Sequence, residues 1–222
     1  MTNHNNDNDQ VGIVSQVIKM VILGDGAVGK TTLIKAIENS VTSFGKNSQA
    51  SDKTERTIFI DFHVVPSTSE SPVIYSIWDL QGQRQVACHP IELTPHSILG
   101  GASIVVFAFA MNDTQSFENL FSSDGWYDIT HEKIERENIP IIFVGNKCDM
   151  NQVVIPEAAE KICKRHPTFK SFIMTSAITG EGIEELISEM NKYVSSLYNY
   201  QTIGSERIFH EVTKSQSKIL DK

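Results

Sequence analysis

The sequence predicts an α/β fold in which helices cover both faces of a mostly parallel sheet. Apolar, strand-like runs alternate along the chain with segments of helical periodicity, which is typical of a parallel sheet. The runs IVVFAFA and IPIIFV contain no alternating polar residues, as expected for strands buried on both faces. With 222 residues, the chain is long enough to bury one full core of this kind.

Six strands are expected from short runs that are rich in β-branched and aromatic residues. They are residues 17–23, 57–65, 72–80, 103–111, 139–146 and 170–177. Helical spacing of apolar residues is found in residues 31–40, about 114–137, 156–165 and 182–198. Residues 83–99 contain two prolines and no clean period, so we expect an irregular, partly helical connection there.

The composition divides the chain into one folded domain and two tails. Residues 1–16 are rich in Asn and Asp and are expected to form a disordered N-terminal tail. Residues 17–199 hold all the predicted strands and helices and form the expected single domain. Residues 200–222 are expected to form a C-terminal tail with at most one short helix.

Charge and cysteine usage exclude several classes of function. A formal net charge of -8 argues against nucleic-acid binding. Three widely spaced cysteines lack metal-ligand spacing and favour reduced thiols in a cytoplasmic protein. No apolar run is long enough for a transmembrane helix. Thr2 in place of glycine, and a C-terminus without cysteine, predict no direct lipid anchor.

The segment GDGAVGKT fits the phosphate-binding pattern G-x-x-x-x-G-K-[ST], between an apolar strand and a helix. Its glycines let backbone N–H groups turn inward toward phosphate oxygens, and the helix adds its N-terminal dipole. Lys30 supplies a positive charge for the β- and γ-phosphates, and Thr31 offers a hydroxyl to Mg²⁺. The predicted nucleotide-binding residues here are Gly24, Asp25, Gly26, Ala27, Val28, Gly29, Lys30, Thr31 and Thr32.

A second motif, WDLQGQ, supplies a carboxylate at the end of a strand. Asp79 there is the expected second protein ligand of Mg²⁺. Gly82 can present its backbone N–H to the γ-phosphate because no Cβ stands in the way. Gln83 then stands next to the phosphate and is positioned to orient an attacking water.

The third motif, NKCD, follows an apolar strand and bears on the choice of base. The N1–H and N2–H₂ groups of guanine are donors, and the carboxylate of Asp149 can accept from both. The stem of Lys147 is expected to lie against the base, and Asn146 to tie this loop to the phosphate loop. An ATPase or nucleotide kinase is the competing interpretation, in which this motif is accidental.

GDGAVGKT, WDLQGQ, NKCD and TSA occur in the order and approximate spacing of the Ras-like small GTPases, which residues 17–199 resemble. The resemblance implies the three-layer P-loop NTPase fold with six strands, GTP/GDP and Mg²⁺ binding, and slow GTP hydrolysis. It also implies an exchange factor, an activating protein and an effector that bind the switch loops. Site residues implied by the resemblance are Ser176 and Ala177 near guanine O6, and Phe44 stacked on the base. Thr57 is the implied switch ligand of Mg²⁺ and the γ-phosphate, with Thr54 as the weaker match.

Several features depart from the family pattern. Gln81 stands where small residues are common and can hinder the second switch, so a GTP-binding module with little hydrolysis is the alternative function. Arg56 is more simply explained as a solvent-facing residue than as a catalytic arginine. A group of cysteine and histidine residues after WDLQGQ lacks the spacing of common zinc sites and is expected on a switch surface. It consists of Cys88, His89 and His96.

Overall fold

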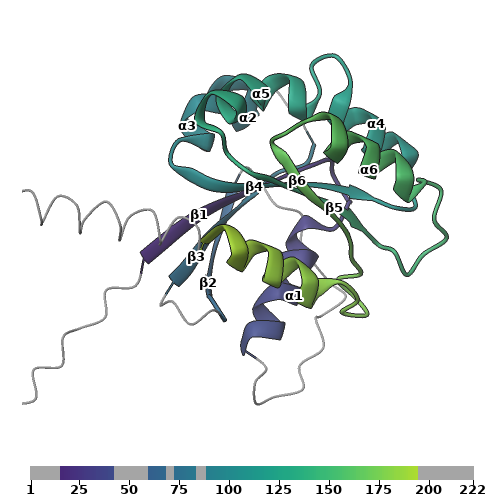
Figure 1. The fold of residues 1–222 in the computed structure, drawn as a ribbon, viewed down its shortest axis with the longest axis horizontal. Coiled ribbons are helices and arrows are strands. Elements are labelled where there is room, and N and C mark those ends of the chain that lie inside the picture. Colours follow the sequence, from purple (N-terminus) through teal and green to yellow (C-terminus); the bar gives the residue numbers. More distant parts are fainter. Residues whose placement is uncertain (1–15, 43–59, 69–72, 84–88, 195–222) are drawn as a thin grey trace, which may run out of the picture.

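A six-stranded sheet lies between two layers of helices (Figure 1). The structure, a computed structural model, describes residues 16–42, 60–68, 73–83 and 89–194. The strands are β1 (Gln16–Leu23), β2 (Ile60–Pro66), β3 (Val73–Leu80), β4 (Ala102–Ala110), β5 (Ile141–Asn146) and β6 (Phe169–Met174). Their order across the sheet is β2-β3-β1-β4-β5-β6, and every pair except β2–β3 is parallel. The predicted fold class is therefore confirmed.

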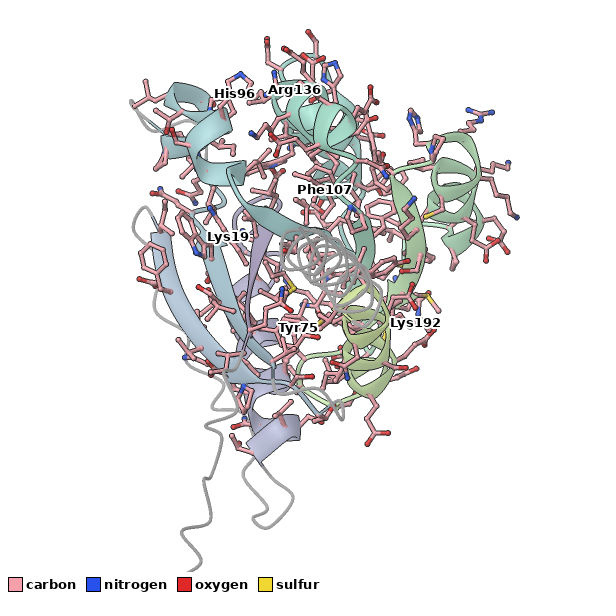
Figure 2. The ribbon with its side chains drawn as sticks, turned by 60° about the vertical axis from the view of Figure 1, so that its left-hand side comes forward. Lys19, Tyr75, His96, Phe107, Arg136 and Lys192 are labelled. Carbon is pink, nitrogen blue, oxygen red and sulfur yellow. The ribbon has the colours of Figure 1, made fainter. Side chains whose placement is uncertain are left out.

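Both faces of the sheet are apolar, which explains why the central strands lack polar alternation. Successive residues of β4 point to opposite faces, so Val106 joins one buried cluster and Phe107 the other. Tyr75 belongs to the cluster with Val106; it and Phe107 are labelled in Figure 2.

The helices divide between the two faces. Helix α1 (Lys30–Thr42) and a final helix, helical in residues 183–194, pack on the face that includes Tyr75. The other face is covered by α2 (Pro90–Leu93), α3 (Pro95–Leu99), α4 (Thr114–Phe121), α5 (Trp126–Glu137) and α6 (Pro156–Arg165). Within the described ranges, no helix is long and apolar enough to cross a membrane.

The helix expected over residues 114–137 is two helices. Helix α4 ends at Phe121 and α5 begins at Trp126, with Asp124 in the left-handed region at φ 56°. A Cβ on Gly125 would come within 2.6 Å of the carbonyl oxygen of Ser122, so this tight turn requires glycine. The break carries Trp126 into the core, where it is fully buried.

Several predicted residues lie outside the described part of the chain. They are Phe44, Thr54, Arg56, Thr57 and Cys88. The expected tails, residues 1–16 and 200–222, lie outside it as well, apart from Gln16, which opens β1. The domain limits and the cytoplasmic location stay predictions.

Candidate nucleotide-binding site

The predicted site residues gather at one edge of the sheet. GDGAVGKT follows β1, WDLQGQ spans the end of β3, NKCD spans the end of β5, and TSA follows β6. Strands β1, β3, β5 and β6 all run in the same direction, so their carboxyl ends meet at that edge. Ligands of open α/β sheets bind at this edge, and the arrangement therefore marks a single site.

The phosphate loop turns sharply through residues at positive φ. Ala27 and Gly29 lie at positive φ, 61° and 94°. The Nζ of Lys30 folds back over the loop and donates to the carbonyl oxygens of Gly24 at 2.8 Å and Asp25 at 2.9 Å. The Lys30 ammonium group is thus held beside the loop where it is expected to bind phosphate.

Lys30 is almost completely buried, with 6% of its surface exposed. Burial lowers the pKa of its ammonium group to about 8, and the nearby carboxylates of Asp79 and Asp25 offset only part of this effect. A buried cation with lowered pKa is a typical mark of a functional site. Bound phosphate oxygens would add negative charge beside the ammonium group and so favour its protonated form.

The hydroxyl group of Thr31 donates to a carboxylate oxygen of Asp79. The two predicted Mg²⁺ ligands therefore come together from α1 and β3, and Asp79 is fully buried. Hydroxyl and carboxylate oxygens are the donors that Mg²⁺ prefers, and the ion keeps its other positions for water and phosphate. The two side chains fit a magnesium site on this chemistry.

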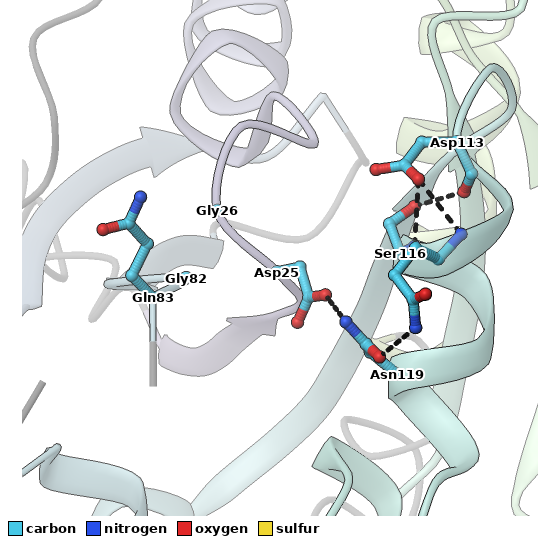
Figure 3. A pocket seen from close by; sticks show the side chains of 8 residues that line it. Asp25, Gly26, Gly82, Gln83, Asp113, Ser116 and Asn119 are labelled. Carbon is cyan, nitrogen blue, oxygen red and sulfur yellow. Dashed lines mark hydrogen bonds between the residues drawn. The ribbon is translucent and has the colours of Figure 1, made fainter. Parts of the chain in front are cut away.

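Gly82 and Gln83 lie directly against the phosphate loop (Figure 3). A Cβ on Gly82 would come within 2.3 Å of the backbone carbon and oxygen of Asp25, so only glycine allows this approach. A Cβ on Gly26 would lie 2.8 Å from Cγ of Gln83. Gly82 and Gln83 both line a cleft of about 310 Å³ that extends to the start of α4.

Asn146 joins three of the four motifs through its carboxamide. The Nδ2 group donates to the carbonyl oxygen of Val28 at 2.9 Å, which confirms the predicted link to the phosphate loop. The Oδ1 atom accepts from the hydroxyl of Thr175 at 3.1 Å and from the N–H of Ala177 at 3.3 Å. The side chain is 2% exposed, so it serves as an internal brace.

The remaining base-recognition candidates lie around this brace. Lys147 adopts φ 63°, and its Cε would lie 3.9 Å from a Cβ on Gly29, so its stem runs over the phosphate loop. Asp149 is exposed and thus open to a ligand. The N–H of Ser176 donates to the carbonyl oxygen of Glu181 at 2.9 Å. This N–H is therefore already bonded within the chain, whereas the resemblance implies that it contacts guanine near O6.

Two features of the site were not predicted. The carboxylate of Asp25 turns away from the phosphate loop and accepts from Trp126 Nε1 at 2.7 Å and Asn119 Nδ2 at 2.6 Å. His89, expected on a switch surface, is buried at 2% exposure and bonded to the Gln81 carbonyl, whereas His96 is exposed as expected. The described residues contain no His/Cys/Asp/Glu group able to hold a metal ion by itself.

The fold and the site define a P-loop nucleotide-binding protein. The model of the Ras family matches residues 19–196, and the chain belongs to this family of small GTP-binding proteins. Related proteins include Ras-related protein Rab-18 of Caenorhabditis elegans, 34% identical over 179 residues that cover 78% of this chain and 79% of that protein. GTP-binding protein YPT53 of Saccharomyces cerevisiae is 28% identical over 95% of this chain and 96% of its own length. Ras-related protein RabO of Dictyostelium discoideum is 30% identical over 158 residues, which span 69% of this chain and 65% of that protein.

Proposed function

We propose that this protein cycles between GTP-bound and GDP-bound states, hydrolyses GTP slowly and signals through its switch loops. One observation carries the proposal: Asn146 holds the phosphate loop, NKCD and TSA together in one brace. This arrangement makes the phosphate and base subsites parts of one rigid site. An accidental NKCD turn has no reason to be bonded to the phosphate loop.

The proposed base is guanine. The exposed carboxylate of Asp149 accepts from the N1–H and N2–H₂ edge, and the stem of Lys147 lies along the ring. Adenine has no pair of donors at that edge. The Ala177 N–H, whose bond to Asn146 is long at 3.3 Å, is the candidate donor to guanine O6.

The phosphates are proposed to lie over the loop from Gly24 to Thr31. Lys30 neutralises charge on the β- and γ-phosphates, and Thr31 with Asp79 would hold Mg²⁺. The ion, when bound, neutralises charge that develops on the phosphates during transfer. Thr57 and Phe44 are proposed to complete the metal and base subsites from residues outside the described ranges.

Gln83 is proposed to orient the attacking water, because its side chain packs on Gly26 at the edge of the phosphate loop. The alternative is a protein that binds GTP with little hydrolysis. It is favoured by the Gln81 side chain, which is buried and donates to the Gln83 carbonyl oxygen at 3.5 Å. That contact restrains the backbone on which Gln83 depends.

Partners are proposed to act on surfaces next to this site. An exchange factor, an activating protein and an effector are the expected classes. Phe62 and Val64 on the edge strand β2 are 62% and 69% exposed, which supports protein binding on this side of the sheet.

The first test identifies the nucleotide released from the purified protein by heat. GDP or GTP is expected, and an adenine nucleotide would refute the guanine assignment. The variant Asp149→Asn sharpens the test, because an amide can donate to the C2 oxygen of xanthine. It should bind GDP weakly and gain affinity for xanthosine diphosphate. Asp128→Asn, an exposed aspartate on α5, is the matched control and should behave as wild type.

The second test separates hydrolysis from binding. Single-turnover phosphate release is measured with GTP and Mg²⁺ for wild type, Gln83→Leu and Gln115→Leu. Gln115 lines the same cleft but is exposed on α4, so it controls for the change of amide to alkyl. Loss of about a hundredfold in Gln83→Leu alone supports catalysis. Equal rates in all three proteins favour the binding-module alternative.

A further inference from the structure

His89 is a buried histidine with bonds at both ring nitrogens. Its Nε2 lies 2.7 Å from the carbonyl oxygen of Gln81, and its Nδ1 lies 3.2 Å from the backbone nitrogen of Ile91. The ring is 2% exposed and packs edge-on against Trp126, with ring centroids 5.6 Å apart. The proposed chemistry gives His89 no role, although its ring is bonded to Gln81, the residue before Gly82.

The two partners assign the ring tautomer. A backbone N–H only donates, so Nδ1 accepts from Ile91 and carries no proton. A carbonyl oxygen only accepts, so the proton lies on Nε2 and is donated to Gln81. The same neutral ring therefore caps the start of α2 and holds the peptide before Gly82.

The bond to Gln81 has a geometric consequence for Gly82. The carbonyl of Gln81 and the N–H of Gly82 belong to one peptide unit, which is planar and trans. In such a unit the two groups point in opposite directions. Once His89 holds the carbonyl, the Gly82 N–H must point away from His89.

We propose that His89 is a positioning residue for the γ-phosphate, because it fixes the direction of the Gly82 N–H. The inference rests on the proposed function, in which that N–H binds the terminal phosphate. His89 then touches no nucleotide itself, but it favours binding of the triphosphate over the diphosphate. GDP lacks the γ-phosphate and should be insensitive to this residue.

The position of His89 is itself coupled to the phosphate loop. Trp126, against which the ring packs, donates its indole N–H to the Asp25 carboxylate. The Asp25 backbone in turn contacts Gly82 so closely that a Cβ there would clash. The His89 ring and Gly82 thus rest on the same segment of the phosphate loop, which supports a fixed distance between that loop and the Gly82 peptide.

Two substitutions separate the two bonds of His89. In His89→Gln, the amide nitrogen occupies the place of Nε2 and keeps the donor to Gln81, but the cap on α2 is lost. In His89→Asn, the side-chain oxygen occupies the place of Nδ1 and keeps the cap, since Asn caps helices well, but it does not reach Gln81. A purely structural role predicts that Asn is the better substitute, and a positioning role predicts that Gln is.

The measurement is the affinity for GDP and for the β,γ-imido analogue of GTP, each with Mg²⁺, by competition with a fluorescent nucleotide. For His89→Asn we expect the preference for the triphosphate to fall about tenfold at unchanged GDP affinity. His89→Gln should stay within about twofold of wild type. Equal preference in wild type and both variants, or a loss in Gln alone, overturns the proposal.

A wild-type protein that binds neither nucleotide refutes the proposed function, whereas a binding wild type with unaffected variants refutes only the role of His89. Should His89→Asn fail to fold, His89→Ser replaces it, because serine also caps helices and is too short for Gln81. Nitrogen NMR of the wild-type ring is a variant-free check, and a proton on Nδ1 instead of Nε2 overturns the proposal.

Discussion

The carboxamide nitrogen of Asn146 donates a hydrogen bond of 2.9 Å to the carbonyl oxygen of Val28. The loop after β5 is thereby attached to the loop before α1, although 118 positions separate the two residues. Each half of the site restrains the other. Loss of this bond should therefore weaken the binding of the phosphates as well as of the base.

Asn146→Asp tests this bond. The substitution places a carboxylate oxygen against the Val28 carbonyl, so a buried hydrogen bond becomes a repulsion between two oxygens. GDP affinity should fall about a hundredfold or more, measured by dissociation of a fluorescent GDP. The matched control is Asn151→Asp, which makes the same change at an exposed position of the same loop region. Equal losses in both variants would point to net charge rather than to the brace.

Gly82→Ala probes the close approach of Gly82 to the phosphate loop. The new Cβ would lie 2.3 to 2.4 Å from backbone atoms of Asp25 and Gly26, so the segment must move away. Single-turnover GTP hydrolysis should fall at least about tenfold, while GDP affinity changes by less than about threefold. Gly101→Ala is the control for an added methyl group, since nothing lies within 4 Å of that position, although its φ of 69° makes alanine mildly strained. A similar loss of hydrolysis in the control would contradict the steric explanation.

The sequence was sufficient for the parallel strands and for the link from Asn146 to the phosphate loop, because both have local signatures. The bonds from Thr175 and Ala177 to Asn146 were not predicted. Uniform apolar runs indicated the parallel strands, and Asn146 followed one of them in NKCD. The break between α4 and α5 also had a signal, since Asp124-Gly125 is a turn dipeptide, but the longer helical pattern obscured it. Propensity summed over a long window hides a short interruption.

The contacts around Asp25 and His89 had no such signature. Asp25 bonds to Asn119 and Trp126, which lie 94 and 101 positions away, and no spacing rule relates them. The partners of His89 are the backbone groups of Gln81 and Ile91. Every residue carries such groups, so the sequence cannot say which one a histidine will meet. Only the folded arrangement identifies these contacts.

Lys30→Met tests the energetic cost of the buried lysine. The folded-state pKa of Lys30 is about 8 against an ordinary value of 10.5, so the unfolded chain binds more protons between these pH values. The penalty for the charged lysine is therefore fully present below pH 8 and disappears as pH rises to about 10.5. Nucleotide-free Lys30→Met should be more stable than wild type at pH 7, by up to about 3 kcal/mol less the lost hydrogen bonds. Urea unfolding at pH 7 and pH 10 should show the difference shrinking, and a pH-independent difference would contradict the pKa shift.

The hydrogen bond from Trp126 to Asp25 links α5 directly to the phosphate loop. Trp126→Phe keeps most of the buried ring but removes the indole N–H that donates to the Asp25 carboxylate at 2.7 Å. A double-mutant cycle with Asp25→Ala should give a coupling energy of about 1 to 2 kcal/mol in urea unfolding of the GDP-bound protein, because the acceptor is charged. The control cycle pairs Asp25→Ala with Trp78→Phe, whose ring contacts Phe62 and Lys19 instead, and should be additive within about 0.5 kcal/mol. Additivity in both cycles would mean that the carboxylate is held by Asn119 alone, and α5 would then lose its direct connection to the phosphate loop.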